Sequence, residues 1–321
     1  MTPTSPSAGA PMRGPRILFA GDVNVDIVMP GLAGPVQLDR EILSTGFDTV
    51  LGSSAAITAC AHARLGGPTA FAGLGGDDAH GALMRTWLEE AGADCRHLVL
   101  SKDQRTGVTV NILTPAGRYQ VTYAGAIPRF VLDPAAVVAD QRIGHVHFSG
   151  IYLQTDLLPR LPAILAELSA AGIGTSIDPQ WDGSGRWWGL DEWVSKLSLL
   201  FVNEDEAMSL SRTTDAEAAL DALSQRCPQV VVKRGAAGVL ARTRSGTFRQ
   251  AGLRIGGFQD AIGAGDNLAA AWLYATRTAG MSEAEALAFA NAAAARSCTF
   301  VGGSAARSTH HDVAYFLESH R

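Results

Sequence analysis

Residues 258–280 read FQDAIGAGDNLAAAWLYATRTAG and place a glycine-rich turn directly before a long alanine-rich helical segment. Gly263 and Gly265 carry no Cβ, so the backbone can turn sharply there and point consecutive N–H groups outward. N–H groups at a helix start favour an anion. Asp266 stands at the same point, where its carboxylate can take a proton from a hydroxyl group. An ordinary turn with Asp266 as the helix N-cap explains the same letters about equally well.

Strand-like apolar segments alternate with helical segments along the rest of the chain. The strand-like segments span 16–23, 68–76, 145–150, 173–178, 198–203 and 229–235, and the helical ones span 55–67, 80–92, 157–172, 215–227 and 285–297. This order predicts an α/β fold with a doubly wound, mostly parallel sheet and helices on both faces. A further β-like stretch at 247–257 precedes the turn of the opening segment.

Two segments interrupt this alternation. Residues 39–51 and 106–125 are rich in Thr, Val and Tyr, and the second has a turn at Pro115-Ala116-Gly117. They predict antiparallel strands off the main sheet. We expect a small β-sheet lid, formed by roughly residues 28–50 and 104–126. Such a lid could cover a ligand at the carboxyl ends of the parallel strands, where these folds bind their ligands.

The composition indicates a globular protein with a small ligand. The 321 residues are 47% hydrophobic and carry a formal net charge of −5, with no long run of one sign. These features argue against a nucleic acid or an anionic membrane as partner and favour a small polar substrate. The Pro- and Ser-rich residues 1–15 predict a flexible tail, and residues 16–321 predict one main α/β domain.

The cysteines and the apolar segments indicate a cellular compartment. Cys60, Cys95, Cys227 and Cys298 lie far apart and form no CxxC pair. This usage suits free thiols in a reducing cytoplasm. No apolar stretch of the sequence reaches membrane-spanning length. We therefore expect a soluble, cytoplasmic protein.

Four separate motifs of the chain resemble the PfkB family of ribokinase-like carbohydrate kinases. Residues 260–266, DAIGAGD, resemble its C-terminal signature D-T-x-G-A-G-D, and residues 52–81 resemble its glycine-rich N-terminal signature. Between them, VNEDEA at 202–207 resembles N-x-x-E, and VVVKRGAAGVL at 230–240 resembles a strand with K-x-G-x-x-G. Each motif alone is weak, but four in the right order make a specific pattern that runs from about Arg16 to the C-terminus.

The resemblance implies an ATP-dependent kinase that moves the γ-phosphoryl group to a hydroxymethyl group of a sugar. It assigns Asp266 as the general base. The anion hole for the transferring group is then formed by the backbone of Gly263, Ala264 and Gly265.

The resemblance also implies a nucleotide side. Asn203 and Glu206 correspond to residues that organise Mg²⁺ and the ATP phosphates, Glu206 through water, and Mg²⁺ commonly keeps several waters in proteins. Without the other motifs, NEDE is an acidic helix start. The nucleotide loop and the adenine contact correspond to Lys233, Gly235, Gly238 and Asn291. Asp260 and Ile262 lie where some members bind a monovalent cation such as K⁺.

On the acceptor side, Asp26 of GDVNVDIVMP falls where the family places an Asp that binds substrate hydroxyls, with Asn24 beside it. A carboxylate can accept two hydrogen bonds from a vicinal diol. A turn at a strand end explains Asp26 in about one case in three. Gly52 and Ser53 occupy the glycine pair that approaches the sugar in the family.

Several positions depart from the family pattern, and most of them bear on the acceptor. Ser53 replaces a Gly, Ile57 replaces a sugar-binding Asn, and Ala261 replaces a Thr. Asp182 replaces an Arg found in keto-deoxy-gluconate kinases, which argues against a carboxylated sugar acid because like charges repel. We therefore expect the reaction to be retained and the substrate to differ.

Two alternatives to a sugar kinase remain open at this stage. One is a nucleoside kinase of the same fold. The other, suggested by Ile57 and Ala261, is a sugar-binding regulator without catalysis, although Asp266, Asn203 and Glu206 argue against it. The resemblance also suggests a homodimer formed through the β lid, where open strand edges can pair.

Two further groups of residues have simpler explanations than a ligand site. His145 and His147 lie two apart on one strand, and without a third ligand they indicate packing rather than a metal site. The tryptophans at 181–193 suit either core packing or stacking on a ligand.

Overall fold

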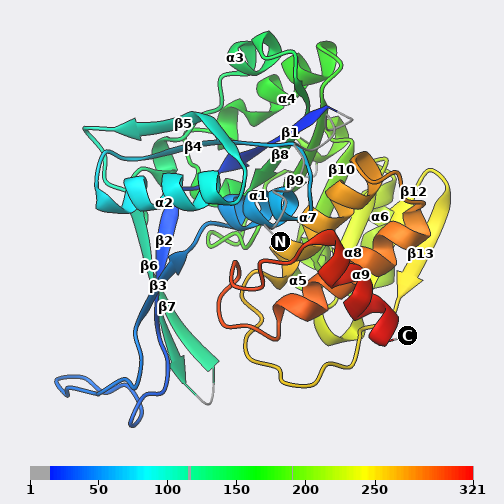
Figure 1. Ribbon diagram of the computed structural model, residues 1–321. Coiled ribbons are helices and arrows are strands. Elements are labelled where there is room, and N and C mark those ends of the chain that lie inside the picture. The colour runs from blue at the N-terminus through cyan, green and yellow to red at the C-terminus, as the bar shows by residue number, and fades with distance from the viewer. Residues whose placement is uncertain (1–14, 115–116, 190, 321) are drawn as a thin grey trace, which may run out of the picture.

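The strand-like segments form one nine-stranded sheet in the computed structural model, which describes residues 15–114, 117–189 and 191–320 (Figure 1). Across the sheet the order is β13 (Gly246–Gln250), β12 (Val239–Thr243), β11 (Val230–Lys233), β10 (Leu199–Asn203), β9 (Gly174–Asp178), β8 (Ile143–Ser149), β1 (Arg16–Gly21), β4 (Thr69–Gly76) and β5 (Asp94–Ser101). Neighbouring strands are parallel except where β12 pairs with β11 and with β13. The predicted mostly parallel sheet is confirmed.

Each face of this sheet carries its own hydrophobic core, because successive residues of a strand point to opposite sides. In β1, Ile17 and Phe19 belong to one core, whereas Leu18 belongs to the other. The first core includes residues of α1 (Ser54–Arg64), α2 (Ala79–Glu90), α7 (Ala264–Arg277), α8 (Glu283–Ser297) and α9 (His310–Ser319). The second includes residues of α3 (Pro134–Ala139), α4 (Leu161–Ala170), α5 (Glu204–Ser211) and α6 (Ala216–Ser224). Helices therefore cover both faces, as predicted.

Four further strands form a separate lid sheet in the order β3 (Asp48–Leu51), β2 (Asn24–Met29), β6 (Gly107–Thr114) and β7 (Gly117–Tyr123). In Figure 1 this lid extends away from the body at the lower left. Strands of both predicted segments pair antiparallel, β3 with β2 and β6 with β7, as expected, whereas the central pair β2 and β6 is parallel. The lid also begins at Asn24 rather than near residue 28, because the chain enters it only two residues after β1 ends.

Some predicted strands are shorter in the structure than in the sequence pattern. Within residues 39–51, only Asp48–Leu51 (β3) form a strand. Before β3, Ser44 makes an isolated β-bridge with Leu32. The β-like stretch at 247–257 ends as a strand at Gln250. Residues 1–14 of the predicted tail, and Pro115 and Ala116 of the predicted turn, lie outside the described residues.

The structure bears on two further predictions, that of free cysteine thiols and that on membrane-spanning segments. All four cysteines are free thiols, and Cys60 and Cys227 are buried. In the part of the chain that the structure describes, none of the helices combines the length and the apolar content needed to cross a membrane.

The two strand histidines belong to the core and share one hydroxyl group. His145 Nε2 and His147 Nδ1 each lie 2.8 Å from the Oγ of Ser176. Burial lowers the pKa of His147 to about 3, so this ring is neutral near pH 7. No cluster of three metal-ligating side chains occurs among the described residues. The burial of both rings and their shared hydroxyl group agree with the prediction of packing.

Candidate active site

Polar residues gather where neighbouring parallel strands end. Asp22 follows β1, Asp178 ends β9, Asn203 ends β10 and Lys233 ends β11. From β1 the chain continues to β4 on one side and later returns at β8 on the other, so the switch point of the sheet lies between β1 and β8. Doubly wound sheets bind their ligands at this point.

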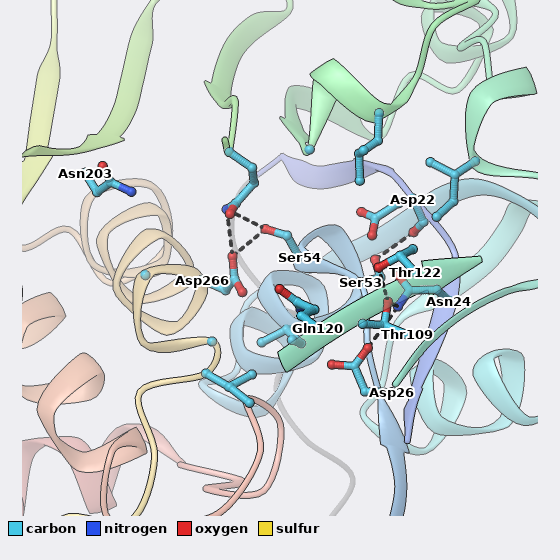
Figure 2. A pocket seen from close by; sticks show the side chains of 18 of the residues that line it. Asp22, Asn24, Asp26, Ser53, Ser54, Thr109, Gln120, Thr122, Asn203 and Asp266 are labelled. Carbon is cyan, nitrogen blue, oxygen red and sulfur yellow. Dashed lines mark hydrogen bonds between the residues drawn. The ribbon is translucent and has the colours of Figure 1, made fainter. Parts of the chain in front are cut away.

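A cavity of about 480 Å³ lies at this edge and is bordered by the lid. The predicted site residues that line it are Asn24, Asp26, Ser53, Asn203, Glu206, Lys233, Ile262, Gly263, Gly265 and Asp266. Figure 2 shows Asp266 between Asn203 on one side and the group around Asp22, Asn24 and Asp26 on the other. The tertiary structure therefore joins the predicted nucleotide and acceptor sides around one carboxylate.

Asp266 is the third residue of α7 and not its N-cap, which is Gly263. Its Oδ1 accepts a hydrogen bond from the hydroxyl of Ser54 and a longer one, 3.5 Å, from the Nε2 of Gln180 (Figure 2). Gln180 Nε2 also donates to the Oγ of Ser54 at 3.0 Å. These contacts fix the carboxylate through one oxygen, so the explanation of Asp266 as an ordinary cap does not hold.

Asp266 is buried, with only 7% of the residue exposed. Burial, supported by the negative charge of Asp178, raises the pKa of Asp266 to about 7, while the Ser54 hydroxyl and Lys233 act in the opposite direction. A carboxylate with a pKa near neutral is a better proton acceptor than one near 4.

The turn before α7 depends on its glycines. Gly263 has φ +71°, and a Cβ there would lie 2.5 Å from the Cα of Gly303. A Cβ at Gly265 would lie 3.1 Å from the Nζ of Lys233, so the missing side chain lets the ammonium group lie against the first turn of α7. Of the three predicted anion-hole residues, Ala264 donates its N–H to the Ala261 carbonyl at 3.2 Å. Because the Ala264 N–H is already used, an anion at this turn would be attracted by the positive end of the helix and by the ammonium group of Lys233.

Lys233 forms a buried ion pair with Asp178, whose side chain is only 1% exposed. Burial acts to lower the pKa of Lys233, but the charges of Asp178 and Glu206 outweigh it and raise the value. Burial, together with the charge of Asp178, raises the pKa of Glu206, while Lys233 acts against this. The ammonium group is therefore a fixed positive charge beside two carboxyl groups.

Asn203 and Glu206 form a capping box at the start of α5. The Oδ1 of Asn203 accepts from the Glu206 N–H at 2.8 Å, and the Oε2 of Glu206 accepts from the Asn203 N–H at 2.9 Å. The structural explanation of NEDE as a helix start is thus correct. It does not exclude a ligand role, because both residues also line the cavity.

Three predicted nucleotide-side residues lie outside the lining of this cavity. Gly235 and Gly238 are in the tight connection between β11 and β12, where Gly238 has φ +97° and a Cβ would lie 2.1 Å from the carbonyl oxygen of Gln250. Asn291 donates from Nδ2 to the carbonyl of Ala251 at 2.8 Å and so ties α8 to the segment after β13. These contacts give Gly238 and Asn291 structural roles.

The residues predicted for the acceptor side lie on β2 and at the inner face of the lid. Asn24 Nδ2 donates to the Oδ1 of Asp26 at 3.0 Å and lies 3.3 Å from the Oγ1 of Thr109. A Cβ at Gly52 would lie 2.3 Å from the Oδ1 of Asp26, so glycine is required there. Gln120 of β7 also lines the cavity.

Ser53 caps α1 and does not merely replace a glycine. Its Oγ accepts from the N–H of Ala56 at 2.9 Å and donates to the carbonyl of Asp22 at 2.6 Å. Its φ is +67°, in the region that favours glycine, as the family pattern has there. Burial raises the pKa of Asp22 to about 6.

Two other predicted positions organise loops. Asp182 accepts from the N–H and hydroxyl of Ser184 and from the N–H of Trp187, and it does not line the cavity. The argument from its charge against a sugar acid is therefore wrong. Asp260 accepts from the N–H of Ile262 at 2.9 Å and from the N–H of Gly302 at 3.2 Å, which joins two loops behind the turn.

Sequence reasoning missed Ser54, Gln180 and Asp178. Ser54 and Gln180 contact Asp266 across separations of 212 and 86 residues. Asp178 begins the DPQWDGSG run. It stands at the end of a predicted strand, and this position was a usable signal for a site residue. Ser54 and Gln180 gave no comparable signal in the sequence.

The fold and the cavity define the class of this protein, a ribokinase-like kinase. A family model described as pfkB family carbohydrate kinase matches residues 23–310. The chain belongs to this family, whose members are phosphotransferases with an alcohol group as acceptor.

Individual relatives agree with this assignment. The chain is 27% identical over 323 residues to an aminoimidazole riboside kinase of Salmonella typhimurium, which covers 95% of this chain and 96% of that protein. It is 30% identical over 283 residues to an ATP-dependent ribose-1-phosphate kinase of Halopiger xanaduensis, covering 87% and 90% of the two chains. The structure of Arabidopsis thaliana ribokinase with ribose and ATP superposes with a TM-score of 0.80 at 23% identity, covering 96% and 99%.

Proposed function

We propose that this protein transfers the γ-phosphoryl group of ATP to a hydroxymethyl group of an uncharged, polyhydroxylated acceptor of the sugar class, with Asp266 as general base. One observation carries the proposal. Asp266 is buried, held through Oδ1 and positioned at the start of α7, in one cavity with Asn24 and Asp26. ATP as donor is supported by the family and by the ATP bound in Arabidopsis ribokinase.

In the proposed reaction the acceptor hydroxyl gives its proton to the carboxylate of Asp266 as its oxygen attacks the γ-phosphorus. A new O–P bond forms, and the bond from the γ-phosphorus to the β–γ bridging oxygen breaks. ADP leaves with that electron pair. The positive end of α7 and the ammonium of Lys233 stabilise negative charge on the transferring group.

The chemistry of the cavity fits Mg²⁺ bound largely through water. The Oδ1 of Asp178 is buried and has no hydrogen-bond partner among the described residues. The carboxamide of Asn203 lies at the end of the neighbouring strand β10, and the carboxyl of Glu206 lies in the first turn of α5. Mg²⁺ prefers oxygen ligands and keeps several waters. Bound there with ATP, it would neutralise the phosphate charge.

The charge of the cavity argues for an uncharged acceptor. Asp22, Glu206 and Asp266 contribute carboxyl groups to the lining. Lys233 is the single Lys or Arg in the lining formed by described residues. It is paired with Asp178 and lies against the first turn of α7, where the transferring phosphoryl group would bind rather than the acceptor. An acceptor that carried a phosphate or a carboxylate would therefore meet like charge.

The test is a set of ADP-release assays with matched acceptors: ribose against ribose 1-phosphate, and fructose against gluconate. We expect kcat/KM to be at least about tenfold higher for the neutral member, since a like-charge contact costs on the order of 1 kcal/mol or more. Replacing Asp22 by Asn should narrow this difference in kcat/KM. An anionic acceptor that equals or exceeds its neutral partner would contradict the proposed substrate class.

A pH profile tests the base separately. Because Asp266 must be ionised and its pKa is raised to about 7, kcat/KM should fall about tenfold per pH unit below pH 7. Removal of the Ser54 hydroxyl, which lowers this pKa, should move the acid limb to higher pH in Ser54→Ala. Removal of the Asp22 charge, which raises it, should move the limb to lower pH in Asp22→Asn.

Opposite displacements of the acid limb are the distinguishing result, because a loss of structure would not shift the two variants in opposite directions. Ser195→Ala serves as the control, since Ser195 is exposed. An acid limb that stays in place in both variants would argue that Asp266 is not the titrating base.

A riboside or nucleoside acceptor is a second candidate, supported by the 27% identical aminoimidazole riboside kinase. Ile57, Ile127 and Leu153 add apolar surface to the cavity that suits the base of such a molecule. Parallel assays with ribosides and free sugars separate the two. Measurable turnover of any acceptor would eliminate the third alternative, a regulator without catalysis.

Two further expectations stay predictions. A homodimer through the lid is supported by the outer side chains of β7, because Tyr119, Val121 and Tyr123 are 54%, 65% and 59% exposed; sedimentation analysis would test it. A monovalent cation beside Asp260 and Ile262 would show as a higher kcat in K⁺ than in tetramethylammonium salts.

A further inference from the structure

A second cavity, of about 270 Å³, lies at the junction between the lid and the body and shares no lining residue with the active-site cavity. It is bordered by β3, α1, α2 and the segment 301–307 that follows α8. Ligand cavities of ordinary size occupy about 300–1,000 Å³, so this one suits a compact molecule.

Two guanidinium groups line this cavity. Arg64 comes from the last turn of α1, and Arg307 comes from the segment 301–307. Within the described residues neither forms an ion pair with an acidic side chain. Arg64 donates from one guanidinium nitrogen to the carbonyl of Ser304 at 2.9 Å, but a guanidinium offers five N–H donors.

The positive charges of Arg64 and Arg307 repel each other. Burial and the charge of Arg307 lower the pKa of Arg64, while Cys60 and Glu90 act in the other direction. A bound anion would relieve this repulsion and accept the remaining N–H donors, as arginine pairs do with phosphate and carboxylate groups.

The lining also has an apolar part. Val50 and Leu51 of β3, Trp87 of α2, Val301 and Ala305 belong to it. An inorganic ion alone would leave these side chains without contact. The chemistry therefore suits a ligand with an oxyanion at one end and a small apolar or ring-shaped body at the other.

We propose that this cavity is a regulatory site for a small organic oxyanion, a phosphate ester or a carboxylate, held between Arg64 and Arg307 with its carbon body against Trp87. The regulatory part of this proposal rests on the proposed kinase function, whereas binding of the oxyanion to the cavity does not.

The segment 301–307 connects this site with the turn before α7. The N–H of Gly302 donates to Asp260, and the Nδ2 of Asn267 donates to the carbonyl of Gly303 at 2.9 Å. Gly303 also lies so close to Gly263 that a Cβ there would overlap it. An anion that draws Arg307 toward Arg64 therefore acts on the segment that supports the anion-binding turn, which is the kind of differential contact that coupling between two sites requires.

Binding is tested by calorimetry and by tryptophan fluorescence with phenyl phosphate and benzoate as probes. Neither has an alcohol group to be phosphorylated. Inorganic phosphate tests the anion without a carbon body, and benzamide tests the ring without a charge. We expect saturable binding of the two organic anions, weaker binding of phosphate and none of benzamide. The fluorescence change should disappear in Trp87→Phe.

The decisive variants are Arg307→Gln and Arg64→Lys. Arg307 is exposed, so its replacement should leave the fold intact. Each variant should weaken the binding of both organic anions at least about tenfold, as expected for the loss of a charged hydrogen bond. Binding that persists undiminished in both variants, or no saturable binding to the unmodified protein, would overturn the proposal.

Regulation is measured with the same probes in the ADP-release assay. A saturating organic anion should change kcat or the KM for ATP at least about twofold in the unmodified protein and leave both unchanged in Arg307→Gln, whose basal activity should be normal. Binding without a kinetic effect would overturn the regulatory role. If no acceptor is phosphorylated at all, the kinase proposal fails, while calorimetry still decides whether the site exists.

Discussion

Replacing Asp266 by Asn is expected to lower kcat by about 10²–10⁴-fold, the range typical for loss of a general base. Asn has nearly the same shape and keeps an oxygen that can accept from Ser54 and Gln180, so the turn before α7 should be preserved. Binding of ATP should change little, since the base acts on the acceptor. Steady-state kinetics, together with a titration of nucleotide binding, measure both quantities.

The same variant should be more stable at pH 8. The pKa of Asp266 is raised on folding, so its ionised form opposes folding at any pH above the ordinary value of an aspartate. An uncharged Asn removes this cost. We therefore expect a higher thermal unfolding midpoint together with the loss of turnover, a combination typical of a strained catalytic group.

The control for this experiment is Asp103→Asn, which removes an exposed carboxylate from the connection between β5 and β6. It should change neither turnover nor stability by a measurable amount. An Asp266→Asn enzyme that works at nearly the normal rate would show that another group takes the proton from the acceptor.

Lys233→Met is expected to lower the free energy of unfolding by about 3–5 kcal/mol, the usual effect of breaking a buried ion pair from one side. The side chains of Lys233 and Asp178 are 11% and 1% exposed, so water cannot compensate the charge that is left. Glu206 would also lose its positive neighbour. Urea denaturation followed by circular dichroism measures the change.

A second substitution separates the ion pair from simple packing. The double variant Lys233→Met and Asp178→Asn should recover part of the lost stability, because it no longer leaves Asp178 charged and unpaired. Lys196→Met replaces an exposed lysine and should change stability by less than about 0.5 kcal/mol. Equal effects of the two single Lys→Met changes would show that the pair does not stabilise the fold.

Much of the architecture was predictable because it is written in local patterns. The apolar segments around residues 16–23 and 198–203 are buried on both faces, and such strands are continuous in the sequence. The lid was less predictable. Its strand β2 is short and follows β1 after two residues, and the parallel pairing of β2 with β6 joins segments about 80 residues apart, which no local pattern specifies.

The residues of the candidate site also differ in how well local sequence patterns predict them. Asp266, Gly263 and Gly265 could be found because a turn and a helix start have a local sequence pattern. Gly238 and Asn291 matched family positions, but their contacts are structural, with the carbonyls of Gln250 and Ala251.

Local patterns in the sequence were enough to predict the order of strands and helices, the glycine turn before α7 and the acidic residue at that helix start. The surroundings of that residue became clear only from the folded chain. Ser54 and Gln180 hold Asp266 in place, and Lys233 is balanced by Asp178. The physical reason is that turns and helix starts form from neighbouring residues, whereas the surroundings of a carboxylate depend on which strand ends the sheet brings together.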